Sequence, residues 1–179
     1  MSITINGSGT LTGVSVGGLP DGIVDTDMLA AESATAAKRG PGSVLQVVHT
    51  DFTSGGITTI STTNTTTFQD TNCTRSITPL RSDSSILIIA HNQIQANVLN
   101  GGNTFRLERN GDTALYPRGN DGGLCHYSSG NDLGTDTLVY LDTTGSWSGA
   151  QTYLVQYLSN GNGSAFTAAF SMTLMEIAA

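Results

Sequence analysis

The sequence contains unusually few charged residues. They make up 12% of its 179 residues, about half of the ~25% found in an average globular domain. Only 7 are Lys or Arg, against 14 Asp or Glu, which gives a net charge of −7. Because nucleic-acid binding depends on clustered Lys and Arg that neutralise phosphates, this composition argues against a nucleic-acid partner.

Long apolar runs and export signals are also missing. No segment approaches the ~20 consecutive apolar residues that a membrane-spanning helix needs, so we expect no membrane insertion. The first ten residues, MSITINGSGT, have neither the basic nor the apolar region of a secretory signal. We therefore expect a protein that is made in the cytosol of the cell that produces it.

Residues that commonly bind metals are few and scattered. Cys73 and Cys125 lie far apart, without a metal-binding spacing. They are predicted to be partly buried thiols, and a disulfide formed after release from the cell is the alternative. The histidines His49, His91 and His126 are isolated as well, and none belongs to an HxH or HExxH motif. We expect no metal and no cofactor.

No catalytic constellation is recognisable. A glycosidase needs two carboxylates that face each other across a cleft, but aspartates such as Asp121 and Asp132 lie in turn-like contexts. Gly-rich phosphate-binding patterns and Walker motifs are absent as well. The expectation is that the protein is not an enzyme.

Thr, Ser, Asn and Gly take the place of the missing charges, and residues 43–179 read as short β-strands separated by turns. In the strongest strand, residues 86–98, the apolar residues Ile86, Ile88, Ala90, Ile94, Ala96 and Val98 share one face, and His91, Gln93, Gln95 and Asn97 lie on the other. Asn110-Gly111 predicts a hairpin, residues 117–136 a long loop, and the Thr-rich residues 57–71 either a strand or a loop. About eight strands over roughly 135 residues fit an antiparallel β-sandwich of the jelly-roll type.

The N-terminal quarter reads differently. Residues 1–22 alternate like short strands but contain too few apolar residues to fold alone, so they are predicted to be an arm that docks on another protein. Residues 23–42 contain one short helix, which is too short to be stable by itself in water. Four of its residues follow the spacing of a coiled-coil seam and predict a trimeric neck: Val24, Met28, Ala31 and Thr35. The alternative is that the helix packs on its own β domain.

The order of these segments resembles a known family. ITINGSGTLTGV is followed by GLPDGIVDTDMLA, by ATAAKRGPGSVLQVV and by a β domain that ends SMTLMEIAA. This resembles the small tail-fibre and virion structural proteins of marine and cyanobacterial tailed phages, most closely over residues 1–48.

The resemblance implies a homotrimer in the virion tail, assembled in the host cytoplasm. Its N-terminal arm would dock on tail or adaptor proteins, and its β head would contact a host glycan or protein. Because the chain has no extended shaft, a capsid or tail decoration protein that stabilises the particle without binding a receptor is the alternative.

Sugar recognition uses an exposed aromatic ring with amides and carboxylates nearby. The only tryptophan lies in TTGSWSGA, a Gly/Ser-rich context that predicts a loop tip. The residues predicted to bind a receptor are Trp147, Tyr127, Tyr116, Asn120 and Asp121. For Trp147 the alternative is that the ring caps the core or packs at a subunit interface.

Overall fold

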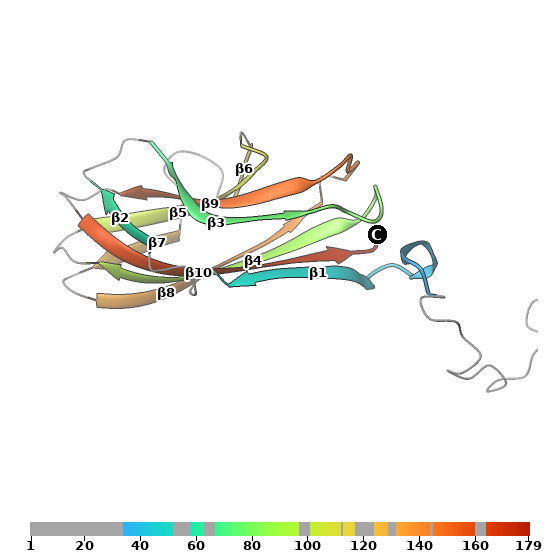
Figure 1. Cartoon of the computed structure of the whole chain (residues 1–179), viewed down its shortest axis with the longest axis horizontal. Coiled ribbons are helices and arrows are strands. Elements are labelled where there is room, and N and C mark those ends of the chain that lie inside the picture. Colours follow the sequence, from blue (N-terminus) through green and yellow to red (C-terminus); the bar gives the residue numbers. More distant parts are fainter. Residues whose placement is uncertain are drawn as a thin grey trace, which may run out of the picture. The chain divides into compact units, whose positions relative to one another are not determined.

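The computed structural model describes residues 34–51, 58–62, 67–96, 101–111, 113–116, 124–128, 132–143, 145–159 and 164–179 (Figure 1). The chain divides into two compact units, Met1–Thr35 and Ala36–Ala179, and the fold below is that of the second. The predicted arm and three of the four neck residues (Val24, Met28, Ala31) lie outside the described residues. The fourth, Thr35, is described and exposed.

The second unit consists almost entirely of antiparallel β-sheet. A single 3-10 turn, Ala36–Lys38, precedes the first strand. We call the two sheets sheet 1 and sheet 2. Sheet 1 contains β1 (Val44–Asp51), β2 (Thr58–Thr62), β4 (Ser85–Ala96), β8 (Asp132–Asp142) and β10 (Ser164–Ile177). Sheet 2 contains β3 (Gln69–Ile77), β5 (Gly101–Arg109), β6 (Thr113–Tyr116), β7 (Leu124–Ser128) and β9 (Gln151–Ser159).

The strand pairing follows a nested order. β4 pairs along one edge of β10, so β1 and β2 share its other edge. In the same way β9 pairs along one edge of β5, while β6 and β7 share the other. If β1 and β2 count as one position and β6 and β7 as another, the described strands fill eight positions along the chain. The first position then pairs with the last, the second with the seventh, the third with the sixth and the fourth with the fifth. This nested pairing is the connectivity of a jelly roll.

The core lies between the two sheets, which face each other in Figure 1. Side chains alternate between the core and the outside along each strand. The sheet 1 side of the core includes Ile86, Ile88, Ala90, Leu138, Met172 and Leu174, and the sheet 2 side includes Phe105, Leu107, Tyr153, Val155 and Tyr157. The predicted mainly β fold is confirmed for the described part of residues 43–179, including the buried face expected for Ile86, Ile88 and Ala90.

The structure corrects one loop and confirms one turn. Residues 117–136, predicted as a long loop, contain β7 and the first residues of β8. Their Asp, Gly and Ser residues resemble a loop, but the backbone pairs with neighbouring strands, which a propensity argument cannot foresee. The predicted hairpin between β5 and β6 is present. Asn110 and Gly111 adopt φ values of 57° and 88°, a conformation that Asn and Gly tolerate best.

Candidate functional site

The described loops with the richest side-chain contacts meet at one end of the sandwich. Here β10, β8, β5 and β3 end, and β1, β4 and β9 begin. We call it the C-terminal end, because the C-terminus lies beside it in Figure 1. Backbone bonds connect its segments: Gly42 N–H donates to Ala178 O at 2.8 Å, and the N–H groups of Ser146 and Trp147 donate to Ser82 O at 3.0 and 3.1 Å.

A buried carboxylate organises the loop between β3 and β4. Glu176 has no exposed surface, and its oxygens accept bonds from the N–H groups of Leu80 (2.9 Å) and Arg81 (3.0 Å). They also accept from Ser84 Oγ (2.8 Å) and Gln46 Nε2 (2.6 Å). Burial alone would raise the pKa of Glu176, but these donors outweigh burial and lower the pKa. The carboxylate thus holds strand β10, strand β1 and this loop together.

A second buried carboxylate closes the end of β8. Asp142 is fully buried, and its Oδ2 atom accepts a bond from Arg109 Nη1 at 2.6 Å and one from the Tyr153 hydroxyl at 3.1 Å. Burial, followed by the nearby Asp142 charge, raises the pKa of Tyr153. The Arg109 guanidinium carbon also lies 5.5 Å from the centre of the Trp147 ring. This cluster links the last residue of β5 to the loop between β8 and β9.

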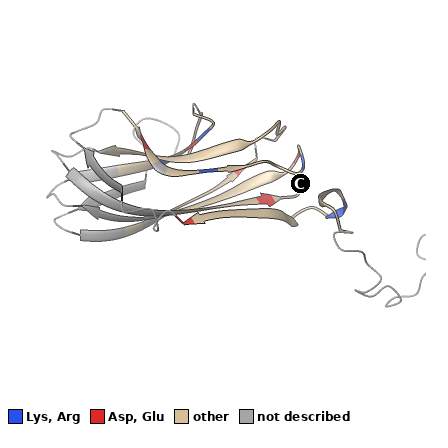
Figure 2. Ribbon diagram, in the orientation of Figure 1, with Lys and Arg blue, Asp and Glu red and all other residues tan. Residues whose placement is uncertain are grey.

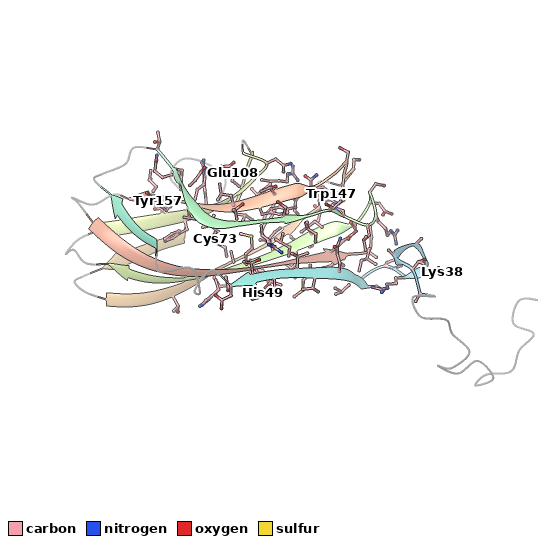
Figure 3. All side chains as sticks on the ribbon, in the orientation of Figure 1. Lys38, His49, Cys73, Glu108, Trp147 and Tyr157 are labelled. Atoms are coloured by element: carbon pink, nitrogen blue, oxygen red, sulfur yellow. The ribbon has the colours of Figure 1, made fainter. Side chains whose placement is uncertain are left out.

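Trp147 is the predicted receptor residue whose side chain the structure describes. Its indole Nε1–H donates to Ser84 O at 2.5 Å, and its half-buried ring packs against the core (Figure 3). The preceding residue, Ser146, has a φ of 119°, which is unusual for a residue with a side chain. Trp147 therefore packs against the core, and a receptor-binding role for the exposed part of its ring stays a prediction.

The remaining surface of Trp147 lines an open depression of about 320 Å³. The rest of its described wall is formed by Arg109, Asn110, Gly145, Ser146, Ser148, Ala150 and Gln151. Much of this wall is already bonded internally: Asn110 Nδ2 donates to Gln151 Oε1 at 3.0 Å, and its Oδ1 accepts from Thr152 N–H at 2.9 Å. The described wall contains no carboxylate, histidine or cysteine, so its chemistry is suited to hydrogen bonding with a polar ligand.

The structure separates Trp147 from Tyr127. Trp147 lies four residues before β9 begins. Tyr127 lies in β7 and pairs with Gly102 of β5. The next residue of β5, Asn103, pairs with Ser159, the last residue of β9. At ~3.3 Å per residue along β9, the two backbones are roughly 25 Å apart. The side chains of Tyr116 and Tyr127, and all of Asn120 and Asp121, lie outside the described parts, so a receptor site there stays a prediction.

Neither Glu176 nor Asp142 belongs to a recognisable sequence motif, although the pattern around Glu176 contains a signal. Glu176 occurs two residues after Leu174 and four after Met172, and a strand places all three side chains on one face. An acid on an apolar face of a strand must find donors inside the protein. The pattern indicates a buried carboxylate, but it does not identify the donors.

Of the two cysteines, Cys73 is the one whose side chain the structure describes. Cys73 is a free thiol with no exposed surface, and burial raises its pKa to about 12. A thiol of this kind is not a nucleophile at neutral pH. Over the described ranges, no group of three or more His, Cys, Asp and Glu residues is arranged to hold a metal ion. Within those same ranges, no helix has the length and apolarity required to cross a membrane.

We expect that truncating Trp147 destabilises the protein. Trp147→Ala removes ring packing and should lower the free energy of unfolding by about 3 kcal/mol. Trp147→Phe keeps part of the packing but leaves Ser84 O without its indole donor, and should cost about 1 kcal/mol. Urea unfolding of the three proteins measures both values. Equal stability of all three proteins would show that the ring does not cap the core.

Comparison with known proteins adds evidence on the fold. No known protein family and no curated protein matches the sequence. Among solved structures, the chain is similar to one from "Structure of infectious bursal disease virus Gx strain", with a TM-score of 0.51 and 12% identity over 76% of this chain and 34% of that chain. The chain thus spans about a third of the length of that protein. At this identity the similarity shows a shared fold.

Two further structures match with lower scores. One is latent PorU from Porphyromonas gingivalis, with a TM-score of 0.40 and 12% identity over 78% of this chain and 13% of that one. The other comes from Bacillus endospore appendages, described as a family of disulfide-linked pili, with a TM-score of 0.36 and 14% identity over 79% of this chain and 96% of that one. With TM-scores below 0.5, neither adds to the argument. The comparisons therefore establish a similarity in fold to one chain of a virus structure.

Proposed function

We propose that this protein is a structural component of a phage virion, a homotrimeric tail fibre protein that contributes to host attachment. The observation that carries the proposal is the nested jelly-roll pairing of β1 to β10, because jelly rolls recur in viral capsid proteins and in lectin domains. The fold shared with a chain of a virus structure and the sequence resemblance to small phage tail-fibre proteins both support it. In this proposal the protein acts by assembly and binding, without catalysis.

The fold also suggests which end of the sandwich contacts the host. The chain enters the sandwich through β1 at the C-terminal end, where the Glu176 and Asp142 clusters brace the loops. The opposite end of the sandwich is farthest from the point where the chain enters it. Because β7, which contains Tyr127, pairs with the start of β5 at that end, we assign host contact to it and connection to the tail to residues 1–22.

Substitution of Tyr127 tests the attachment role. In phage that carry Tyr127→Ala, we expect adsorption to fall about 30-fold, because aromatic residues dominate binding surfaces. Particle yield and copy number of the protein should not change. Thr74→Ala, an exposed position on β3, serves as the matched control. Adsorption assays, together with mass spectrometry and immunogold labelling of purified particles, provide the readouts.

Each outcome separates the proposal from its alternative. Reduced adsorption by intact particles, with the protein located at the tail, supports a tail fibre. Normal adsorption by particles that break more easily indicates a decoration protein. Absence of the protein from purified particles would overturn both assignments, and hydrolysis of host polysaccharide by the purified protein would overturn the non-catalytic role.

A further inference from the structure

The outer face of sheet 1 is aliphatic near the C-terminal end of the sandwich. The strand register places Val47, Met175, Leu87 and Leu141 in one row across β1, β10, β4 and β8. The adjacent row contains His49, Thr173, Ile89 and Val139. Their chain neighbours Ile86, Ile88, Leu138 and Leu174 are buried in the core, so the side chains of both rows point outward. We define the aliphatic face as Val47, Leu87, Ile89, Val139, Leu141 and Met175.

The outer face of sheet 2 differs in its chemistry. There Gln156 Nε2 donates to Asp70 Oδ1 at 2.7 Å, and Arg106 Nε donates to Gln156 Oε1 at 2.7 Å. The Arg106 guanidinium also lies 4.0 Å from the centre of the Phe68 ring. A solvated antiparallel sheet is expected to have a polar outer face of this kind. The six aliphatic side chains include no charged residue, and the Lys, Arg, Asp and Glu marked on the described strands in Figure 2 lie outside them. His49 lies beside them on the edge strand β1, where its Nδ1 atom is 2.8 Å from Thr173 Oγ1.

The sequence of the strands shows the same property. Ile86–Ala90 and residues 138–141 are uninterrupted apolar or aromatic runs, a pattern typical of sheets that are buried on both faces. Yet Val47 is 54% exposed, Val139 55% and Leu141 46%. Two rows of side chains across four strands cover roughly 19 Å by 13 Å, or about 250 Å². Exposed aliphatic side chains gathered in this way on one sheet face, rather than scattered singly, offer a surface for contact between proteins.

We infer that the aliphatic faces of three copies of this chain pack around a common threefold axis. The inference rests on the homotrimer of the proposed function and names its contact surface. The aliphatic face contains no Lys, Arg, Asp or Glu that could pair with a charged partner surface. The same uncharged face on another copy of the chain leaves no buried charge unpaired in the contact. Each copy also supplies the same twisted sheet, which can stack against another sheet with interdigitating side chains.

The width of the face suits a threefold arrangement. Four strands at ~4.8 Å spacing are roughly 19 Å wide. Three faces of this width form a triangular prism whose axis lies roughly 5.5 Å from each sheet, close to half of the ~10 Å that separates two packed sheets. The aliphatic side chains of three copies would therefore fill the prism. Each face would contact both neighbouring copies, which raises the area buried per chain above that of any one contact.

The experiment measures the mass of the full chain in solution. We expect the wild-type protein to have three times the mass of one chain by light scattering coupled to size exclusion. Val47→Lys and Val139→Lys each place a charge in the apolar contact and should raise the dissociation concentration of the trimer about 100-fold or more. Thr74→Lys makes the same charge change at an exposed position of sheet 2 and should leave the trimer intact.

Isosteric variants keep the test valid if a lysine variant does not fold. Val47→Thr and Val139→Thr retain the β-branched shape, and weaker trimers with unchanged circular dichroism would support the inference. Trimers of wild-type strength in the Lys or Thr variants would overturn this interface but leave the virion role intact. A wild-type protein that is monomeric or dimeric at every concentration would also overturn it, whereas the virion role depends separately on finding the protein in purified particles.

Discussion

Replacement of Glu176 by alanine is expected to lower the free energy of unfolding by about 4 kcal/mol. The substitution leaves the backbone N–H groups of Leu80 and Arg81 without their acceptor, and Ser84 and Gln46 each lose a partner. A buried donor left without an acceptor costs about 1–3 kcal/mol. Glu176→Gln keeps the shape and one acceptor oxygen but points an amide at backbone donors, and should cost about 2 kcal/mol.

Urea unfolding at pH 7 measures this effect. Asp83→Asn is the matched control, because Asp83 lies in the same loop but pairs with Arg81 at the exposed surface. An exposed ion pair contributes little to stability, so the control should unfold close to the wild type. An equal loss of stability in both variants, or none in either, would contradict the role of Glu176 as the acceptor that organises the loop.

The same carboxylate should make stability depend on pH. The pKa of Glu176 is lowered in the folded protein from its ordinary value of 4.5. A lowered pKa means that the ionised carboxylate stabilises the folded protein. This stabilisation is fully present above the unfolded-state pKa, and it is lost as the pH falls below about 4.5 and through the folded-state pKa. Below pH 4.5 the wild type should therefore lose more stability than Glu176→Gln, which has no carboxyl group to titrate at this position. Parallel pH profiles of the two proteins would contradict the prediction.

The second large effect is expected at Asp142. Asp142→Ala should lower the free energy of unfolding by about 3–5 kcal/mol, because it leaves the Arg109 charge, whose side chain is 17% exposed, beside an apolar gap. The Tyr153 hydroxyl also loses its acceptor. Tyr153→Phe, which removes only that hydrogen bond, should cost about 1 kcal/mol.

A double variant separates the lost ion pair from lost packing. Asp142→Leu with Arg109→Met replaces both charges by apolar groups of similar volume, and should be more stable than Asp142→Leu alone because the Arg109 charge no longer faces an apolar side chain. Thermal unfolding of the two single variants and the double variant completes the cycle. Additive losses would show that the two side chains do not interact.

The fold was predictable where local signals were strong. Alternation identified the buried face of β4, and Asn110-Gly111 identified the hairpin, since both depend on residues adjacent in the chain. The same reasoning was wrong for residues 124–128 and 132–136, whose polar composition resembles a loop. These residues form strands because β5 and β4 supply their backbone partners, and no local pattern encodes a distant partner.

The candidate site was less predictable than the fold. The Gly/Ser context of Trp147 suggested an exposed tip, but the loop turns back so that its N–H groups and indole bond to Ser82 and Ser84. Ser84 and Tyr153, which donate to Glu176 and Asp142, lie 92 and 11 residues away from them in the chain, so no local pattern connects donor and acceptor. Backbone donors such as Leu80 N–H have no signature in a sequence at all.

The sequence by itself determined the class of the protein: low charge and period-two apolar patterns allow a β-sandwich, and few chemically reactive clusters are present. Tertiary structure decided which strands share an edge, where two buried carboxylates find their donors, and which side of the apolar runs faces outward. The physical reason is that alternation specifies two faces of a strand but not what covers either of them. In sheet 1 the inner face meets sheet 2, whereas the aliphatic outer face is where we place the other copies of the chain.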